Sequence, residues 1–356
     1  MGWLKLKEAG MKDGYIRKLM GYYKTYEELF CDENFKLFNT GLKTMLEKAR
    51  NIDISKKMDL YYKNRIRIIS ANDREYPEKL KKIIDYPLFL YVKGKSLNEF
   101  INTDDRIRKN IAVVGTRRAT KFGKSSCERI VKELLYYNVN LISGLAEGID
   151  TIALTVAVEK EGNAVAVVGS GLDRVYPYEN KILWEKISGN GILISEYPLG
   201  TEPLKWNFPK RNRIIAGLAD GIIIAESFKS GGSLITAELG FSMDKEIFAI
   251  PGFINYPSFE GCNNLIKENK AKLITCAEDV AQEFLWDINK EKSKISKLNE
   301  EEKLLFCHLY EETGLEELME KVKNKIPLNR ILSILMSLKV KGLIIETGTA
   351  KYVRLI

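Results

Sequence analysis

Residues 208–238 read FPKRNRIIAGLADGIIIAESFKSGGSLITAE. The central run, 221–225, is apolar on both faces, which is typical of a buried strand in a parallel sheet. We expect a helix to begin near Arg211, Asn212 and Arg213, so that the free N–H groups of its first turn favour an anion. The small residues 230–233 then predict a second anion-binding turn at the same end of the strand.

The residues on both sides of this stretch repeat a pattern of short apolar strand, glycine-bearing turn and helix. The apolar runs between residues 111 and 275 are IAVVG, NLISG, AVAVVG, ILISE, GIIIA, FAIPG and AKLIT. Such alternation predicts a doubly wound, mostly parallel α/β sheet of Rossmann type. Ligands of these sheets bind beyond the carboxyl ends of the strands, where the turns at 115–117, 143–145, 169–171 and 230–233 are expected to meet.

The regions that flank this pattern predict three further segments. Residues 1–65 form short helical patterns broken by glycines, and 66–288 would be the sheet domain. Residues 289–300 are charged and lack aromatics, which indicates a linker. Residues 301–356 show three helical patterns and a hairpin, the layout of a winged helix, although a protein-docking module has the same layout.

Composition excludes several classes of chemistry. The 356 residues are 45% hydrophobic and 29% charged, and no run is long and apolar enough to span a bilayer, so we expect a cytoplasmic protein. The five cysteines include no C-x-x-C pair, and His308 is the single histidine. These counts argue against a disulfide framework, a zinc ribbon or a multi-histidine metal site, and we expect neither metal nor cofactor.

The net charge of +8 is concentrated near the N-terminus. Residues 1–70 hold 15 Lys+Arg and 9 Asp+Glu, a balance of +6. This balance suits a polyanion, but a lysine-rich helix face exposed to solvent is equally common, so direct binding of nucleic acid by the N-terminal helices is left open. In the sheet domain any polyanion affinity must come from a local patch.

The turn after the first strand of the pattern, VVGTRRATKFG (113–123), lacks the G-x-G-x-x-G of dinucleotide-binding proteins. Arg117 and Arg118 occupy it instead. A basic turn before a helix favours contact with phosphate, without the close backbone approach that a pyrophosphate needs.

Together these motifs resemble the DNA-processing protein A (DprA/Smf) family. The resemblance rests on VVGTRRATKFG, ISGLAEGID, VGSGLDRVYPYEN, SEYPLGTEPLKWNFPKRNRIIAGLADGIIIAES, KSGGSLITAELG, FAIPG and GCNNLIKENKAKLIT, which follow one another between residues 113 and 275. It implies an extended Rossmann domain after a small helical (SAM-like) domain. It also implies sequence-independent binding of single-stranded DNA, homodimers, help in loading RecA recombinase during natural transformation or recombination, and no catalytic turnover.

The resemblance and the two anion-binding turns give one set of candidate DNA-binding residues. The resemblance places in the pocket Gly115, Thr116, Arg117, Lys205, Phe208, Arg211, Asn212 and Arg213. The turn before the last helix of the opening stretch adds Ser230, Gly231 and Ser233. This chain departs from many relatives, which carry Arg where Glu147 stands, His where Leu154 stands and often a basic residue where Tyr178 stands. Losing positive charge at Glu147 and Tyr178 could weaken phosphate contact, but Tyr178 could instead stack on a base.

Two other classes of function compete with this interpretation. SGGSLITAE is loosely similar to the loop of Rossmann-type nucleotide phosphoribohydrolases (the LOG family), in which Glu238 and Arg211 would act on a nucleoside monophosphate. However, Leu234 and Ile235 stand where that loop keeps Gly-Thr. A third possibility is an adaptor whose Rossmann domain binds only protein, and the basic FPKRNR segment argues against it.

Overall fold

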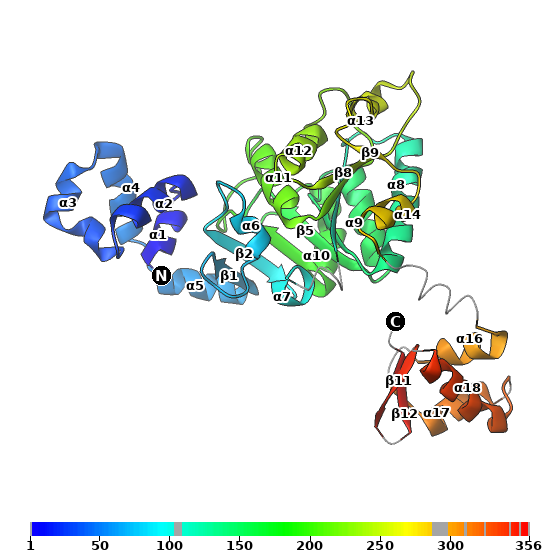
Figure 1. Ribbon diagram of the computed structural model, residues 1–356. Helices are drawn as coiled ribbons and strands as arrows, with labels where there is room; N and C mark the ends of the chain where they lie inside the picture. Colours follow the sequence, from blue (N-terminus) through cyan, green and yellow to red (C-terminus); the bar gives the residue numbers. More distant parts are fainter. Residues whose placement is uncertain are drawn as a thin grey trace. The chain divides into compact units, whose positions relative to one another are not determined.

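The structure is a computed structural model that describes residues 2–102, 109–286, 298–309, 312–323, 325–341, 343–348 and 350–354. It divides into two compact units, Met1–Val280 and Ala281–Ile356. Figure 1 shows the elements of both. The predicted linker, 289–300, falls largely outside the described residues.

Helices make up the first part of the larger unit. They are α1 (Gly2–Glu8), α2 (Asp13–Tyr22), η1 (Glu27–Phe30), α3 (Asp32–Leu37), α4 (Thr40–Arg50) and α5 (Ile54–Lys63). Their apolar faces enclose a small core that includes Leu6, Ile16, Leu29 and Leu46. Asn39 and Asp53 cap α4 and α5, because their side-chain oxygens accept hydrogen bonds from first-turn N–H groups.

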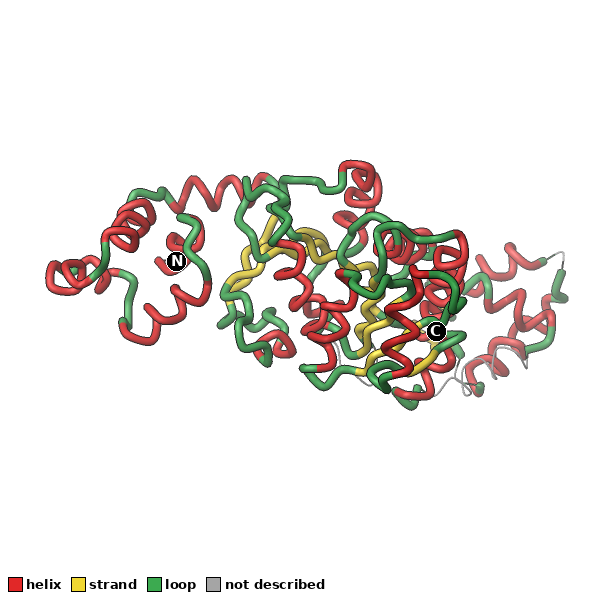
Figure 2. The backbone as a smooth tube through the Cα atoms, turned by 90° about the horizontal axis from the view of Figure 1, so that it is seen from above, coloured by secondary structure: helices red, strands yellow, loops and turns green. Residues whose placement is uncertain are grey.

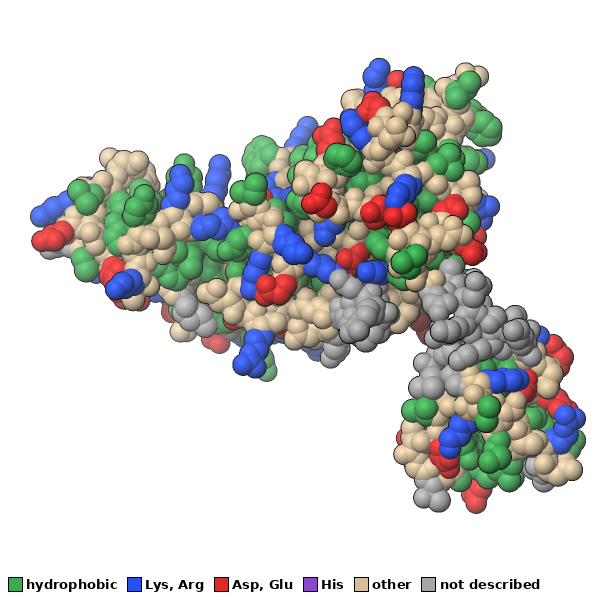
Figure 3. Space-filling view, in the orientation of Figure 1, with side chains coloured by type: hydrophobic (Ala, Val, Ile, Leu, Met, Phe, Trp, Pro, Cys, Tyr) green, Lys and Arg blue, Asp and Glu red, His purple; other side chains and the backbone are tan. Residues whose placement is uncertain are grey.

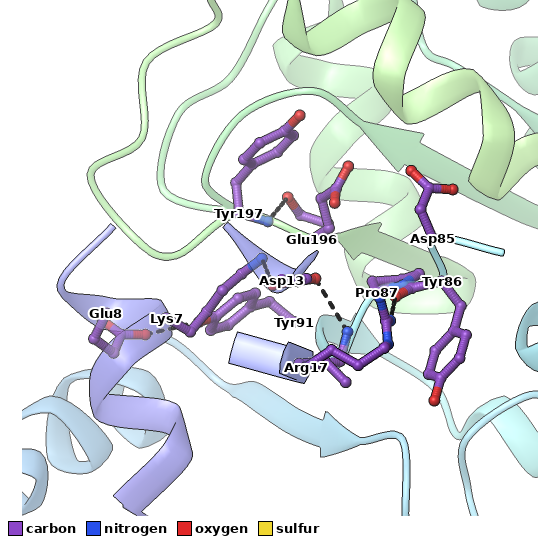
Figure 4. A network of polar contacts seen from close by, with 12 residues as sticks. Lys7, Glu8, Asp13, Arg17, Asp85, Tyr86, Pro87, Tyr91, Glu196 and Tyr197 are labelled. Carbon is purple, nitrogen blue, oxygen red and sulfur yellow. Dashed lines mark hydrogen bonds and ion pairs between the residues drawn. The ribbon is translucent and has the colours of Figure 1, made fainter. Parts of the chain in front are cut away.

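Buried polar contacts join these helices to strand β2 (Phe89–Gly94) (Figure 4). The Glu8 carboxylate accepts a hydrogen bond of 2.8 Å from the Tyr91 hydroxyl. Asp13 accepts one of 2.6 Å from Lys7 Nζ and one of 3.1 Å from the backbone N–H of Leu88. Because buried polar groups need partners, these bonds fix how the helices sit on the sheet.

The centre of the larger unit is a nine-stranded sheet with the order β1-β2-β6-β5-β4-β3-β7-β8-β9 among the described residues. The strands from β6 to β9 in this order pair in parallel, and β1 and β2 add an antiparallel edge. Besides β2, the strands are β1 (Ile66–Ser70), β3 (Asn110–Val114), β4 (Asn140–Ser143), β5 (Asn163–Val168), β6 (Ile192–Ser195), β7 (Gly221–Ile224), β8 (Glu246–Ala249) and β9 (Lys272–Leu273). The predicted doubly wound, mostly parallel sheet is confirmed.

Helices cover both faces of the sheet, so the strands lie between them (Figure 2). One layer contains α8 (Lys121–Leu134), α9 (Ile149–Glu159) and α10 (Lys181–Asn190), and the other contains α11 (Asn207–Leu218) and α12 (Gly232–Phe241). The remaining helices are α6 (Glu78–Lys81), α7 (Leu97–Phe100), η2 (Leu135–Tyr137), η3 (Tyr178–Asn180), η4 (Pro257–Phe259), α13 (Glu260–Lys267) and α14 (Ala277–Glu283). Covered on both sides, every residue of β3, β4, β6 and β7 is buried.

The chain direction across the sheet reverses at β3. The strands β3, β4, β5 and β6 progress toward one edge, and β7 then returns to the other side of β3. In open α/β sheets the loops diverge at such a point and leave a crevice beyond the carboxyl ends of the strands. The topology therefore places the expected ligand site between the turns that follow β3 and β7.

The smaller unit combines three helices with a three-stranded antiparallel sheet of order β10-β12-β11. Its described elements are α16 (Glu300–Phe306), β10 (Thr313–Gly314), α17 (Leu315–Val322), α18 (Leu328–Val340), β11 (Ile344–Gly348) and β12 (Lys351–Arg354). A capping box between Asn299 and Glu302 begins α16. These are the three helices and the hairpin that the sequence predicts for a winged-helix-like fold.

Among the helices of the described residues, none has the length and apolar character that crossing a membrane requires.

Candidate nucleic-acid interface

A cavity of about 560 Å³ lies at the carboxyl ends of the strands, where the sheet order reverses. Turns that are far apart in the sequence meet there, since they follow β3, β4, β5, β6 and β7. Of the predicted site residues, all except Arg213 and Ser230 line it: Gly115, Thr116, Arg117, Lys205, Phe208, Arg211, Asn212, Gly231 and Ser233. The sheet thus brings together residues that the sequence separates by more than a hundred positions.

The positive charge at the mouth of the cavity comes from two exposed side chains, Arg117 and Lys205. Neither forms an ion pair with a described residue. Gly231 also lines the cavity and precedes α12, and no side chain caps the N-terminus of that helix. Its first-turn N–H groups and the positive end of the helix dipole therefore add to the attraction for an anion.

An aromatic ring stands beside these cations. Phe208 is half-buried, and its ring centroid lies 5.4 Å from that of Tyr176. The guanidinium carbon of Arg117 lies 5.2 Å from the centre of the Phe208 ring. This combination suits a nucleotide whose base is not stacked in a duplex, because the ring can stack on the base while the cation contacts the phosphate.

Arg211 forms the floor of the cavity and is only 3% exposed. Its guanidinium donates hydrogen bonds to the backbone carbonyls of Gly144, at 2.6 Å, and of Val167. The carboxylate of Asp150 lies beside it and accepts a hydrogen bond of 3.1 Å from the N–H of Gly144. A Cβ atom at Gly144 would come within 2.6 Å of both side chains, so the glycine permits this packing. Arg211 thus ties together the carboxyl ends of β4 and β5.

Each of these two buried charges offsets part of the effect that burial has on the pKa of the other. Burial raises the pKa of the Asp150 carboxyl to about 6, although Arg211 and backbone N–H groups act to lower it. Burial lowers the pKa of the Arg211 guanidinium to about 10, against the attraction of Asp150. At neutral pH the pair is charged, and each partner depends on the other.

The structure corrects the predicted start of helix α11. The helix begins at Asn207, so Arg211, Asn212 and Arg213 lie inside it and their backbone N–H groups do not face a ligand. Pro209 is tolerated because it falls in the first turn, where its missing N–H has no intrahelical partner to lose. The contribution of this segment to the cavity comes from its side chains.

Arg213 points away from the cavity, toward the antiparallel edge of the sheet. Its guanidinium contacts the carboxylates of Glu196 at 2.7 Å and Asp85 at 2.8 Å (Figure 4 labels both acids). Residues two positions apart on a helix lie on different faces, which is why Arg211 lines the cavity and Arg213 does not. Ser230 is exposed and also lies outside the cavity lining.

Sequence reasoning assigned no role to Asp150 or Thr236, which also line the cavity. Asp150 ends the motif ISGLAEGID, and the available signal was an acidic residue at the start of a predicted helix after a strand. Thr236 lies one turn into α12 and is 1% exposed, and nothing in its local sequence distinguishes it from a core residue.

The cavity lining does not include Glu238 of the competing hydrolase hypothesis, or any of the three positions at which this chain departs from many relatives. Glu238 is exposed and does not line the cavity, so the structure does not bring it to Arg211 as a nucleotide-hydrolysing pair would require. Glu147 is exposed and lines a smaller hollow beside Arg117, and Leu154 is buried in the core. Tyr178 is 70% exposed and lies outside the lining of the cavity.

Metal-binding side chains are not grouped at this site or elsewhere in the described part of the chain. No set of three or more His, Cys, Asp or Glu residues there could hold a metal ion.

The fold and the cavity together define a Rossmann-type α/β protein with a cationic, aromatic-bearing pocket at the switch point of its sheet. The chain belongs to the DNA recombination-mediator protein A family, whose model matches residues 67–285.

Two relatives support this assignment. DNA processing protein DprA of Streptococcus pneumoniae (strain ATCC BAA-255 / R6) is 38% identical over 287 residues, which are 79% of this chain and 96% of that protein. DNA processing protein DprA of Bacillus subtilis (strain 168) is 37% identical over 63% of this chain and 73% of that protein. The resemblance inferred from the motifs is confirmed.

Two solved structures are similar as well. The X-ray structure of DNA processing protein A from Streptococcus pneumoniae superposes with a TM-score of 0.68 at 35% identity, over 80% of this chain and 98% of that chain. A structure of DNA processing protein A from Helicobacter pylori has a TM-score of 0.56 at 27% identity, over 63% of this chain and 97% of that chain. That second structure concerns the single-stranded DNA binding mode of the Helicobacter pylori protein.

Proposed function

We propose that this protein binds single-stranded DNA without base specificity in the cavity at the switch point, and that it carries out no catalytic turnover. The observation that carries the proposal is the convergence of Arg117, Lys205 and the uncapped N-terminus of α12 on one cavity beside the Phe208 ring. The cations neutralise phosphates, and the ring accepts an unstacked base of any identity. The family assignment and the Helicobacter pylori relative support it.

A single strand fits this arrangement better than a duplex does. The Phe208 ring is half-buried among the turns, so a base reaches it only after leaving a helical stack. Contacts to the phosphate backbone carry no sequence information, and stacking carries little. We therefore expect affinity to depend on strandedness and on salt, and hardly on base sequence.

The test is fluorescence anisotropy of the full chain with labelled oligo-dT, oligo-dC and a duplex of equal length. Both single strands should bind with similar affinity, and more tightly than the duplex. Tighter binding of the duplex, or no binding of either single strand, would contradict the proposal.

As to partners, we propose that the protein acts in the cytoplasm as a homodimer that helps load RecA recombinase onto the bound strand. The edge strand β9 and helix α13 offer a surface for the dimer: Leu273 is 49% exposed on the last strand of the sheet. The description of the family as a recombination mediator supports the recombinase as partner.

Light scattering at micromolar concentration should show a dimer alone and a larger complex with RecA and oligo-dT. A monomer whose mass is unchanged by RecA would reject both partners.

A further inference from the structure

A second group of aromatic side chains lies on the same edge of the sheet as the cavity. The rings of Phe122, Phe253 and Tyr256, here called the aromatic platform, are 43%, 61% and 52% exposed. Phe253 lies 5.6 Å from each of the other two rings, measured between centroids. Phe259, only 1% exposed, supports Phe122, since its ring centroid is 5.4 Å from that of Phe122. Exposed rings held by a buried one form a fixed apolar surface.

Backbone hydrogen bonds hold the platform in place relative to the cavity. The backbone carbonyl of Glu226, just after β7, accepts a hydrogen bond of 2.8 Å from the N–H of Thr116. The carboxylate of Glu226 accepts one of 2.9 Å from the N–H of Thr120. The next residue, Ser227, accepts 2.8 Å from the N–H of Gly261 in α13. These bonds connect the cavity turn after β3, the start of α8 that carries Phe122, and the segment before α13. The elements that carry the platform are therefore bonded to the same segment after β7 as the cavity turn is.

Positive charge surrounds the platform. Lys121 and Lys124 in the first turn of α8 are exposed, and neither has an ion-pair partner among the described residues. Lys229 is exposed too, and its ion pair with Glu260 is 3.5 Å long. Figure 3 shows hydrophobic side chains together with Lys, Arg and some acidic side chains at the end of the sheet domain where α13 lies in Figure 1. Rings interspersed with lysines are the pattern of surfaces that bind single strands.

We propose that the aromatic platform is a second binding surface for the same DNA strand, on which bases stack after the backbone leaves the cavity past Arg117. The proposal rests on the proposed function and extends the DNA-binding surface from the cavity to the aromatic platform. The occupant is a polyanion because of the surrounding charge.

The experiment compares two lengths of oligo-dT, one of about five nucleotides that fills the cavity alone and one of about twenty that also reaches the platform. Phe253→Leu keeps an apolar side chain and removes the ring, and Phe253→Tyr keeps the ring. We expect Phe253→Leu to lower the affinity for the long oligonucleotide at least about five-fold, which is the least that stacking of one base contributes. Its affinity for the short oligonucleotide should be unchanged. Phe253→Tyr should bind both lengths like the wild type.

A charge variant tests the same surface without touching its packing. The double variant Lys121→Gln with Lys124→Gln should flatten the slope of log K against log salt by up to about 0.7 per lysine for the long oligonucleotide. The slope for the short oligonucleotide should be unchanged. Tyr22→Ala, an exposed tyrosine on α2, is the control and should have no effect.

Three results would overturn the inference. If Phe253→Leu and the lysine variant bind the long oligonucleotide as the wild type does, the strand does not cross the platform and the cavity alone is the site. If Phe253→Leu changes the mass of the free protein in light scattering, the platform is a contact between copies. If the wild type binds neither length, the proposed function itself fails.

Discussion

Replacing Arg211 by alanine should lower the free energy of unfolding by about 3–5 kcal/mol at neutral pH. The variant loses the hydrogen bonds to the carbonyls of Gly144 and Val167, and it leaves the Asp150 carboxylate buried without its cation. A loss of this size is a large share of the stability of an ordinary domain, which is about 5–15 kcal/mol. Urea unfolding followed by circular dichroism measures it.

The same variant should respond to pH in a defined direction. Burial already raises the pKa of Asp150 to about 6, above its ordinary value, so the folded protein takes up this proton more readily than the unfolded chain. The free energy of unfolding therefore falls as the pH rises through about 6, because Asp150 must be ionised while buried. Without Arg211 this fall is larger. We expect the destabilisation to shrink between pH 7 and pH 5, where the carboxyl is neutral.

The control for this experiment is Lys205→Ala, which removes an exposed cation from the same cavity and should change stability by less than about 0.5 kcal/mol. If Arg211→Ala were as stable as the wild type and yet bound DNA poorly, Arg211 would contact the ligand directly and would not be the structural floor.

Replacing Arg117 by alanine should weaken binding of oligo-dT at least ten-fold, with little change in stability. Arg117 is exposed at the mouth of the cavity, where a charge-assisted hydrogen bond to phosphate contributes about 1.5–3 kcal/mol. Neutralising one fewer phosphate should also flatten the slope of log K against log salt by about 0.7. Lys205→Ala should have the same signature. Anisotropy titrations with oligo-dT of about five nucleotides at several salt concentrations measure both quantities.

Arg118→Ala is the matched control, because Arg118 is the next residue, is also exposed, and does not line the cavity. It should leave affinity and slope for the short oligonucleotide unchanged. Equal losses in Arg117→Ala and Arg118→Ala would show a diffuse electrostatic effect, and unchanged affinity in Arg117→Ala and Lys205→Ala would place the site on another surface.

The sequence predicts the sheet and the meeting of its turns for a simple physical reason. Runs such as GIIIA can only be buried, and in a parallel sheet the turns that follow them converge at one edge. The cavity thus collects Gly115, Lys205, Phe208 and Gly231, as the convergence of these turns requires.

The direction in which a side chain points from its helix is harder to predict. Arg211 and Arg213 look equivalent in the segment KRNR, but the helix that carries them begins four residues earlier than the sequence pattern indicates. With that start, they face opposite sides of α11. Their partners are Asp150, in the first turn of α9, and Glu196, just after β6. Both are distant in the sequence, so local sequence cannot reveal them.

The most direct test of the central claim is amide hydrogen exchange of the full chain with and without saturating oligo-dT. A strand held at the switch point should slow exchange in peptides covering residues 115–117, 205–212 and 231–236, which include much of the cavity lining. Slowed exchange confined to residues 2–63 or 313–354, with the cavity turns unchanged, would contradict it.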